Sequence, residues 1–159
     1  MTEVQTERWT RVSRHIKARA QSLYDAFLDP DALVSWLPPD RMTGTLHRFE
    51  GGVGGGYCLS LTYPPDEAHP AGKTAAHEDK VTVRFVELIP PARIVQTATF
   101  HTTDPDLMGE MTMVITFDAT ADGTELGLLC RNLLPGIRLE DNEVGSRQSL
   151  EQLARRFGS

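Results

Sequence analysis

The sequence predicts an α+β fold in which a curved antiparallel sheet of about seven strands grips a long C-terminal helix. One strand-like segment comes first, and two short helical segments follow it. Residues 42–132 then alternate apolar and polar side chains between turn signals, and the chain ends in an amphipathic segment. The connections are too short for the crossovers that parallel strands need. With 159 residues, the chain is expected to form a single domain over 1–159.

The first three elements each have a local signal. Side chains alternate over Trp9–Lys17, which predicts a strand. Residues 20–28 carry an apolar stripe at helical spacing, which predicts the first helix. The second helix begins at Asp29 and Pro30, since aspartate caps free N–H groups and proline suits the first helical position. Pro38 and Pro39 end this helix near Trp36.

Alternation and turn residues predict six further strands. They are Met42–Glu50, Tyr57–Tyr63, Lys80–Ile89, Ile94–His101, Glu110–Asp118 and Glu125–Asn132. The glycine run at 51–56 is followed by a strand and lacks the lysine of a phosphate-binding loop, so it is interpreted as a hairpin tip.

The last element is predicted as a helix over Asn142–Phe157. Ser146, Leu150, Leu153 and Phe157 fall on one face of this helix. Gly158 is then expected to stop it.

Composition excludes several classes of function. The net charge of −6 disfavours nucleic acid and anionic membranes as partners, because both require a clustered positive field. No apolar run approaches the ~20 residues that span a bilayer. The polar start shows no signal peptide, so a cytoplasmic location is expected.

Cys58 and Cys130 make neither a disulfide framework nor a zinc site. The histidines show no metal-ligand spacing, and we expect no cofactor.

Several motifs follow one another in an order that resembles a known superfamily. They are Val12–Ala18, Leu23–Phe27 with Asp29-Pro30 and Trp36, the glycine hairpin, Val86–Val95, Met113–Phe117 with Asp122-Gly123-Thr124, and Ser149–Ala154. In this order they resemble the START-like (SRPBCC, birch-pollen-allergen-like) superfamily with its helix-grip fold. Within it they are similar to the branch of activator of heat-shock-protein-90 ATPase homologues.

The resemblance implies a cavity between the sheet and the C-terminal helix, which in many relatives takes an apolar small molecule. It implies no shared catalytic residues: some relatives are cyclases, dehydratases or hydrolases, and others bind lipids or partner proteins. One departure concerns the terminal helix. Members of this branch often carry Gly-Trp near its start, whereas this chain has Gly145-Ser146. The missing ring is expected either to enlarge the pocket or to be replaced by another side chain.

Arg14 shares a strand face with Val12 and Ile16, which is expected to point inward. A buried guanidinium needs an anion, so Arg14 either orients a polar ligand head or pairs with an acid such as Glu50, Glu78 or Glu87. A further alternative is that Arg14 turns outward at the edge of the sheet.

Trp36 is either an aromatic wall of the ligand site or a packing residue of the helix pair. His47 is a candidate polar group inside the sheet. Residues 64–79 form a long connection, and one hypothesis is that this segment is a lid over the cavity.

The ligand-binding residues predicted from these arguments come from the strands and helices around the expected cavity. They are Arg14, Trp36, His47, Tyr57, Leu59, Val83, Phe85, Phe100, Met113, Ile115, Ser146 and Leu150. No catalytic or metal-binding residue is assigned.

Three functions remain open on the sequence. The first is binding of an apolar or amphipathic small molecule, without catalysis. The second is a cofactor-free cyclase, dehydratase or hydrolase, polyketide cyclase-like, that uses an inward histidine or glutamate. The third is a co-chaperone-like interaction module, which requires a contiguous exposed patch. The sequence also allows a homodimer.

Overall fold

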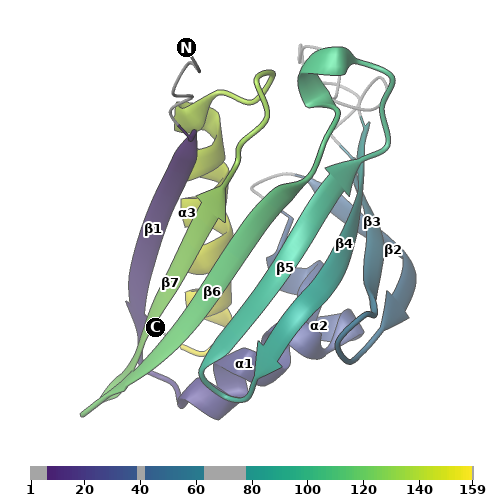
Figure 1. Ribbon diagram of the computed structural model, residues 1–159. Helices are drawn as coiled ribbons and strands as arrows, with labels where there is room; N and C mark the ends of the chain where they lie inside the picture. The colour runs from purple at the N-terminus through teal and green to yellow at the C-terminus, as the bar shows by residue number, and fades with distance from the viewer. Residues whose placement is uncertain (1–6, 39–41, 63–77, 159) are drawn as a thin grey trace.

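A computed structural model describes residues 7–38, 42–62 and 78–158 of the chain. Seven strands form one antiparallel sheet in the order β1-β7-β6-β5-β4-β3-β2, as Figure 1 shows. The strands are β1 (Trp9–Ile16), β2 (Thr43–Glu50), β3 (Gly56–Thr62), β4 (Glu78–Ile89), β5 (Arg93–Phe100), β6 (Met111–Thr120) and β7 (Gly123–Arg131). The helices are α1 (Ala20–Leu28), α2 (Pro30–Trp36), the short 3-10 helix η1 (Pro105–Leu107) and α3 (Leu139–Arg156). The predicted α+β helix-grip architecture is therefore confirmed.

The three α-helices lie on one side of the sheet, behind the strands in the view of Figure 1. We call this side the inner face and the opposite side the outer face. The helix α3 lies behind β1 and β7, whereas α1 and α2 lie across the lower part of the sheet. Alternate strand residues point between these layers and form the core, as the period of two requires.

The predicted cap of α2 is present. The Asp29 carboxylate accepts hydrogen bonds from the backbone N–H groups of Asp31, at 3.0 Å, and Ala32, at 3.4 Å. The glycine run forms the tip between β2 and β3, as expected, and Gly52 and Gly54 have positive φ angles. These conformations suit glycine because it lacks the Cβ atom that clashes there.

The helix α3 begins at Leu139, three residues before the predicted start. Leu139, Glu140 and Asp141 are exposed, so they add nothing to the apolar stripe from which the start was predicted. The two acidic side chains occupy the first turn, where they interact favourably with the helix dipole. Gly158 follows the helix with a φ of +80° and ends it as predicted.

Side chains of α3 hold the C-terminal end of α2. The Gln152 amide Nε2 donates to the carbonyl oxygens of Trp36 at 2.7 Å and Pro38 at 2.6 Å. Ser149 Oγ donates to the carbonyl oxygen of Leu37 at 2.6 Å. These bonds satisfy carbonyls that have no partner at the end of a helix, and they fix α2 against α3.

Candidate functional site

The inner face of the sheet gathers most of the residues predicted to bind a ligand. Strand alternation points Tyr57 and Leu59 of β3 to this face, together with alternate residues of β4, β5 and β6. Cross-strand pairing then places these residues side by side, since Tyr57 lies opposite Val83. The predicted residues that share the inner face are Tyr57, Leu59, Val83, Phe85, Phe100, Met113 and Ile115.

Aromatic rings line the β2–β4 part of this face. The rings of Phe49 and Tyr57 stack with centroids 6.0 Å apart, and Phe85 meets both edge-on at 6.1 and 6.0 Å. Burial raises the pKa of Tyr57 to about 12, although a hydrogen bond with the Gln96 side chain opposes the shift. The Tyr57 hydroxyl is therefore neutral over the physiological range of pH.

The helix α3 contributes the opposite wall. Leu150 and Leu153 are fully buried in the core, as the predicted stripe requires. Ser146 lies one turn before Leu150 on the same stripe and is half-buried, in hydrogen-bonding contact with Cys130 of β7. Leu150 and Ser146 thus join the group of predicted residues that the fold brings together.

Part of this apolar face is accessible to solvent. Leu46, Leu61, Val81, Phe100 and Met113 pack against the core, yet each is only half-buried. They lie on β2 to β6, away from the strand β1 over which α3 packs. An apolar surface that remains accessible on the inner face is where an apolar ligand gains free energy by leaving water.

Three predicted ligand residues lie apart from this group. Trp36 is only 1% exposed; its ring packs on Phe27 with centroids 4.6 Å apart, and its indole N–H donates to the carbonyl oxygen of Ala26 at 3.0 Å. The observed contacts of Trp36 therefore match the packing interpretation. Arg14 lies on the same face of β1 as Val12 and Ile16, which is the inner face, and it pairs there with Glu151 of α3, with Nε 2.6 Å from Oε1. Arg14 therefore has an acidic partner, and this acid differs from the three that the sequence suggested.

His47 lies on the outer side of β2. Its Nε2 atom is 2.7 Å from the hydroxyl of Ser60. Ser60 follows the inner-face residue Leu59 on β3, so its side chain lies on the outer face. His47 directly follows the inner-face residue Leu46, so strand alternation turns it to the outer face, and the register shift between Leu46 and Arg48 leaves Arg48 on that face as well.

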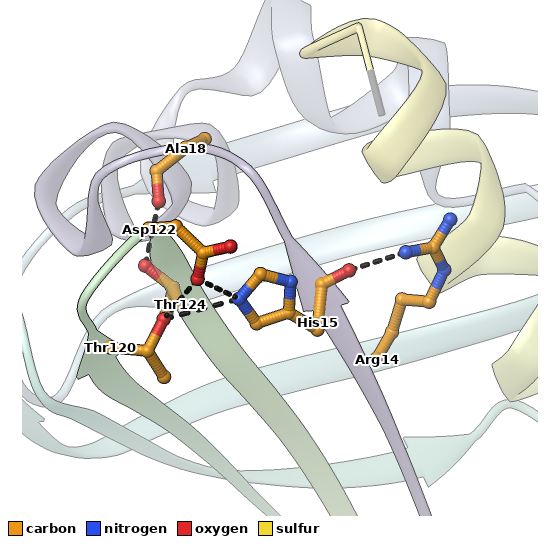
Figure 2. Close-up of polar contacts among 6 residues, drawn as sticks. All are labelled: Arg14, His15, Ala18, Thr120, Asp122 and Thr124. Atoms are coloured by element: carbon orange, nitrogen blue, oxygen red, sulfur yellow. Dashed lines mark hydrogen bonds and ion pairs between the residues drawn. The ribbon is translucent and has the colours of Figure 1, made fainter.

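Two other histidines are placed by the structure. His101 Nε2 is 2.6 Å from the hydroxyl of Thr82, and that side chain is exposed. His15 Nε2 is 3.1 Å from both the Thr120 hydroxyl and the Asp122 carboxylate, as Figure 2 shows.

The His15 cluster contains the residue types of a hydrolytic triad but lacks its geometry. In such a triad, one ring nitrogen faces the hydroxyl and the other faces the carboxylate. Here both contacts converge on Nε2, so the ring cannot take a proton from Thr120 while donating one to Asp122. The neighbouring backbone is held independently, because the Thr124 hydroxyl donates to the Ala18 carbonyl at 2.8 Å. We interpret the cluster as a set of surface contacts that stabilises the packing of β1 against the β6–β7 turn.

Sequence reasoning missed the polar residues of the inner face. Gln96 is 4% exposed, and its Nε2 atom donates to the Met113 sulfur at 3.7 Å. A signal existed, because Gln96 alternates with the apolar residues Ile94 and Ala98 and so falls on the buried face of its strand. Asn142 was missed as well, since its role depends on contacts with Thr10 and Cys130 that are distant in sequence.

The outer face carries a separate open groove of about 410 Å³. Trp9 and Arg11 of β1, Val114 of β6 and Leu129 and Arg131 of β7 are among the residues that line it. The Trp9 side chain is 55% exposed, and Arg131 forms two 3.1 Å contacts with Glu7 at one end. This groove is an exposed apolar surface with arginine at its rim.

Within the described residues, no group of three His, Cys, Asp or Glu side chains gathers closely enough to hold a metal ion. No helix in the same part of the chain is both long and apolar enough to span a bilayer. The lid hypothesis for residues 64–79 falls almost entirely on positions outside the described residues.

Several solved structures share this fold. Protein CV1439 from Chromobacterium violaceum is 29% identical, with 95% of this chain and 97% of that chain covered at a TM-score of 0.83. Mll3558 from Rhizobium loti is 22% identical, with 94% and 96% covered at a TM-score of 0.71. DynU16, from the dynemicin biosynthetic locus, is 18% identical at a TM-score of 0.65; the match covers 95% of this chain but 47% of DynU16.

No curated protein matches this chain at a significant level. A family model does match, over residues 17–158, which includes every element except β1. Its match over nearly the whole chain agrees with the order of motifs in the sequence and with the architecture of the sheet and α3. The chain belongs to the family described as Activator of Hsp90 ATPase homolog 1-like protein.

Proposed function

We propose that this protein binds a hydrophobic small molecule on the inner face of its sheet, between the strands and α3. The observation that carries the proposal is the accessible apolar strip on that face, where Phe100, Met113 and their neighbours are only half-buried. Each Å² of apolar surface that a ligand removes from water there contributes roughly 25 cal/mol before the costs of ordering.

Comparison with relatives supports a small-molecule role without specifying the ligand. The family and the helix-grip fold are compatible with ligand binding or with a polyketide cyclase-like reaction. DynU16 comes from the dynemicin biosynthetic locus, but at 18% identity the likeness concerns the fold.

The catalytic alternative requires an acid–base group on the inner face. His15, His47 and His101 instead contact polar side chains elsewhere on the sheet. His69 and His77 lie outside the described residues. The described part of the inner face does hold a buried carboxylate, that of Asp79 of β4, which lies opposite Leu61. Catalysis would require Asp79, whereas binding rests on the accessible apolar strip, and binding is the function that we propose.

The groove on the outer face favours a second candidate, an interaction module that docks a partner over Trp9 and Leu129. The exposed indole ring and the arginine rim give this surface the composition of a binding patch. A small apolar probe can enter this groove as well, so a binding test must separate the two faces.

Ser146 offers the direct test. A tryptophan at this position places a large ring between α3 and the sheet, in contact with the space that the proposal assigns to ligand. We expect Ser146→Trp to weaken binding of the neutral dye N-phenyl-1-naphthylamine at least about tenfold, or about 1.4 kcal/mol. Fluorescence titration measures the affinity, and a thermal melt confirms that the variant is folded.

Trp9→Ser is the matched variant on the outer face. If ligand binds on the inner face, Trp9→Ser leaves the dye affinity unchanged. The proposal is refuted if Ser146→Trp binds the dye as the unmodified protein does, or if Trp9→Ser alone abolishes binding. The second result would move the site to the outer groove.

A further inference from the structure

A row of side chains with oxygen, nitrogen or sulfur atoms crosses the inner face at one level of the sheet. Thr10 of β1 lies opposite Cys130 of β7, Cys130 lies opposite Met113 of β6, and Met113 lies opposite Gln96 of β5. The next row is wholly apolar and consists of Val12, Leu128, Ile115 and Ile94. One polar row in an apolar face is therefore a local feature of this site.

One end of this row is completed by α3. The Thr10 hydroxyl is hydrogen-bonded to the Asn142 side chain. Burial raises the pKa of the Cys130 thiol, although hydrogen bonds with Thr10, Asn142 and Ser146 oppose the shift. The thiol is thus neutral, and together these groups make a cluster of uncharged donors and acceptors beside the half-buried Ser146.

The other end of the row is Gln96. Its amide N–H donates to the thioether sulfur of Met113 at 3.7 Å, and sulfur of this kind is a weak acceptor. Gln96 is buried, and its side chain also hydrogen-bonds the Tyr57 hydroxyl, so only the N–H that faces the sulfur has a weak partner. A ligand oxygen in front of Gln96 would be a stronger acceptor for that N–H than the sulfur.

Charge is absent from the row. Thr10, Cys130, Met113 and Gln96 are all uncharged at neutral pH, and the Arg14 guanidinium is engaged by Glu151. An ionised ligand buried against the row would have no counter-charge there, which disfavours carboxylate and phosphate ligands.

We propose that the inner site binds an uncharged apolar molecule with two hydroxyl or carbonyl oxygens, one facing Gln96 and one facing the Cys130–Ser146 cluster. Gln96 and Cys130 lie on strands two apart, so their backbones are separated by roughly 10 Å. The two oxygens therefore belong at opposite ends of a rigid body of about two fused rings. This inference rests on the proposed function and specifies its ligand class.

The test uses four naphthalene compounds that compete with N-phenyl-1-naphthylamine: naphthalene, 2-naphthol, 2,6-naphthalenediol and 6-hydroxy-2-naphthoate. We expect 2,6-naphthalenediol to bind about tenfold more tightly than naphthalene, with 2-naphthol between them. The naphthoate, which is similar in shape but anionic, should bind at least about tenfold more weakly than the diol.

Two variants test whether the polar row causes the preference for the diol. Gln96→Met and Ser146→Ala keep the approximate volume and remove one hydrogen-bonding end each, so each should lose most of the preference for the diol over 2-naphthol. Thr97→Val, on the outer side of β5 next to Gln96, is the control and should retain it. Melting temperatures establish that all three variants are folded.

The outcomes separate this inference from the proposed function. If the dye binds but the four compounds compete equally, or if the row variants keep the preference for the diol, the polar row has no role in recognition and the inference is wrong. If neither the dye nor any competitor binds the inner face, the proposed function fails, and the inference fails with it.

Discussion

The Gln152→Leu substitution tests how strongly α3 holds α2 beside the candidate site. Gln152 Nε2 bridges the carbonyl oxygens of Trp36 and Pro38, at 2.7 and 2.6 Å. Leucine has a similar volume and helix propensity, so the substitution removes the two hydrogen bonds with little change in packing. Both carbonyls lie at the C-terminal end of α2, where no helical partner replaces the lost donor.

The structure sets the size of the expected effect. Each lost hydrogen bond contributes about 1 kcal/mol, so we expect the free energy of unfolding to fall by about 2 kcal/mol. At about 2.1 cal/mol/K per residue, the unfolding entropy of 159 residues is about 0.33 kcal/mol/K, which lowers Tm by about 6 °C.

Urea titration followed by circular dichroism measures the free energy, and a thermal melt measures Tm. Gln148→Leu is the matched control, because Gln148 lies one turn earlier on α3, is half-buried and makes no hydrogen bond through its side chain to a described residue. It should change stability by less than about 0.5 kcal/mol. If Gln152→Leu destabilises no more than this control, α3 does not hold α2 through these bonds.

Three further predictions concern stability. Tyr24→Phe should raise the free energy of unfolding by about 1 kcal/mol in urea titration, since the buried Tyr24 hydroxyl bonds to no described residue; a loss would reveal an unseen partner. Gly56→Ala should cost about 3 kcal/mol in the same assay, because φ is +150° and a Cβ atom would lie 1.9 Å from a β4 carbonyl oxygen. Gly51→Ala, with open space around the added methyl group, should cost less than about 0.5 kcal/mol, and equal costs would contradict the explanation. The Arg14 hydrogen bond lowers the pKa of Glu151 below its ordinary value of 4.5, so their pair stabilises the fold above that value and is lost as pH falls through the lowered folded pKa. Urea midpoints across this acid range should therefore vary less with pH in Glu151→Gln than in the unmodified protein, and identical profiles would exclude a contribution from the pair.

Local signals predicted most of the elements. The Asp29-Pro30 start of α2, the glycine tip between β2 and β3, and the stop of α3 at Gly158 all lie where the sequence placed them. Each depends on the conformation of a few neighbouring residues. The start of α3 at Leu139 was missed because its first turn is exposed and has no apolar periodicity.

The candidate site was predicted less evenly. Apolar residues such as Leu59, Val83 and Ile115 were found because period-two alternation fixes which side of a strand they occupy. His47 was expected inside, but it directly follows the inner-face residue Leu46 and so points outward, while the register shift before Arg48 still lets Phe49 point inward. The Arg14–Glu151 pair joins residues 137 positions apart, and no local pattern selects that acid from the others.

The sequence by itself determined the order of the elements, the face on which each apolar residue lies and the family to which the motifs point, because caps, turns and alternation act over a few residues. Only the tertiary structure decided which strands lie in register, and hence that Thr10, Cys130, Met113 and Gln96 form one row. It also decided which side chains of α3 reach the row and the end of α2. These contacts join distant parts of the chain, and their geometry is set by sheet pairing and helix packing together.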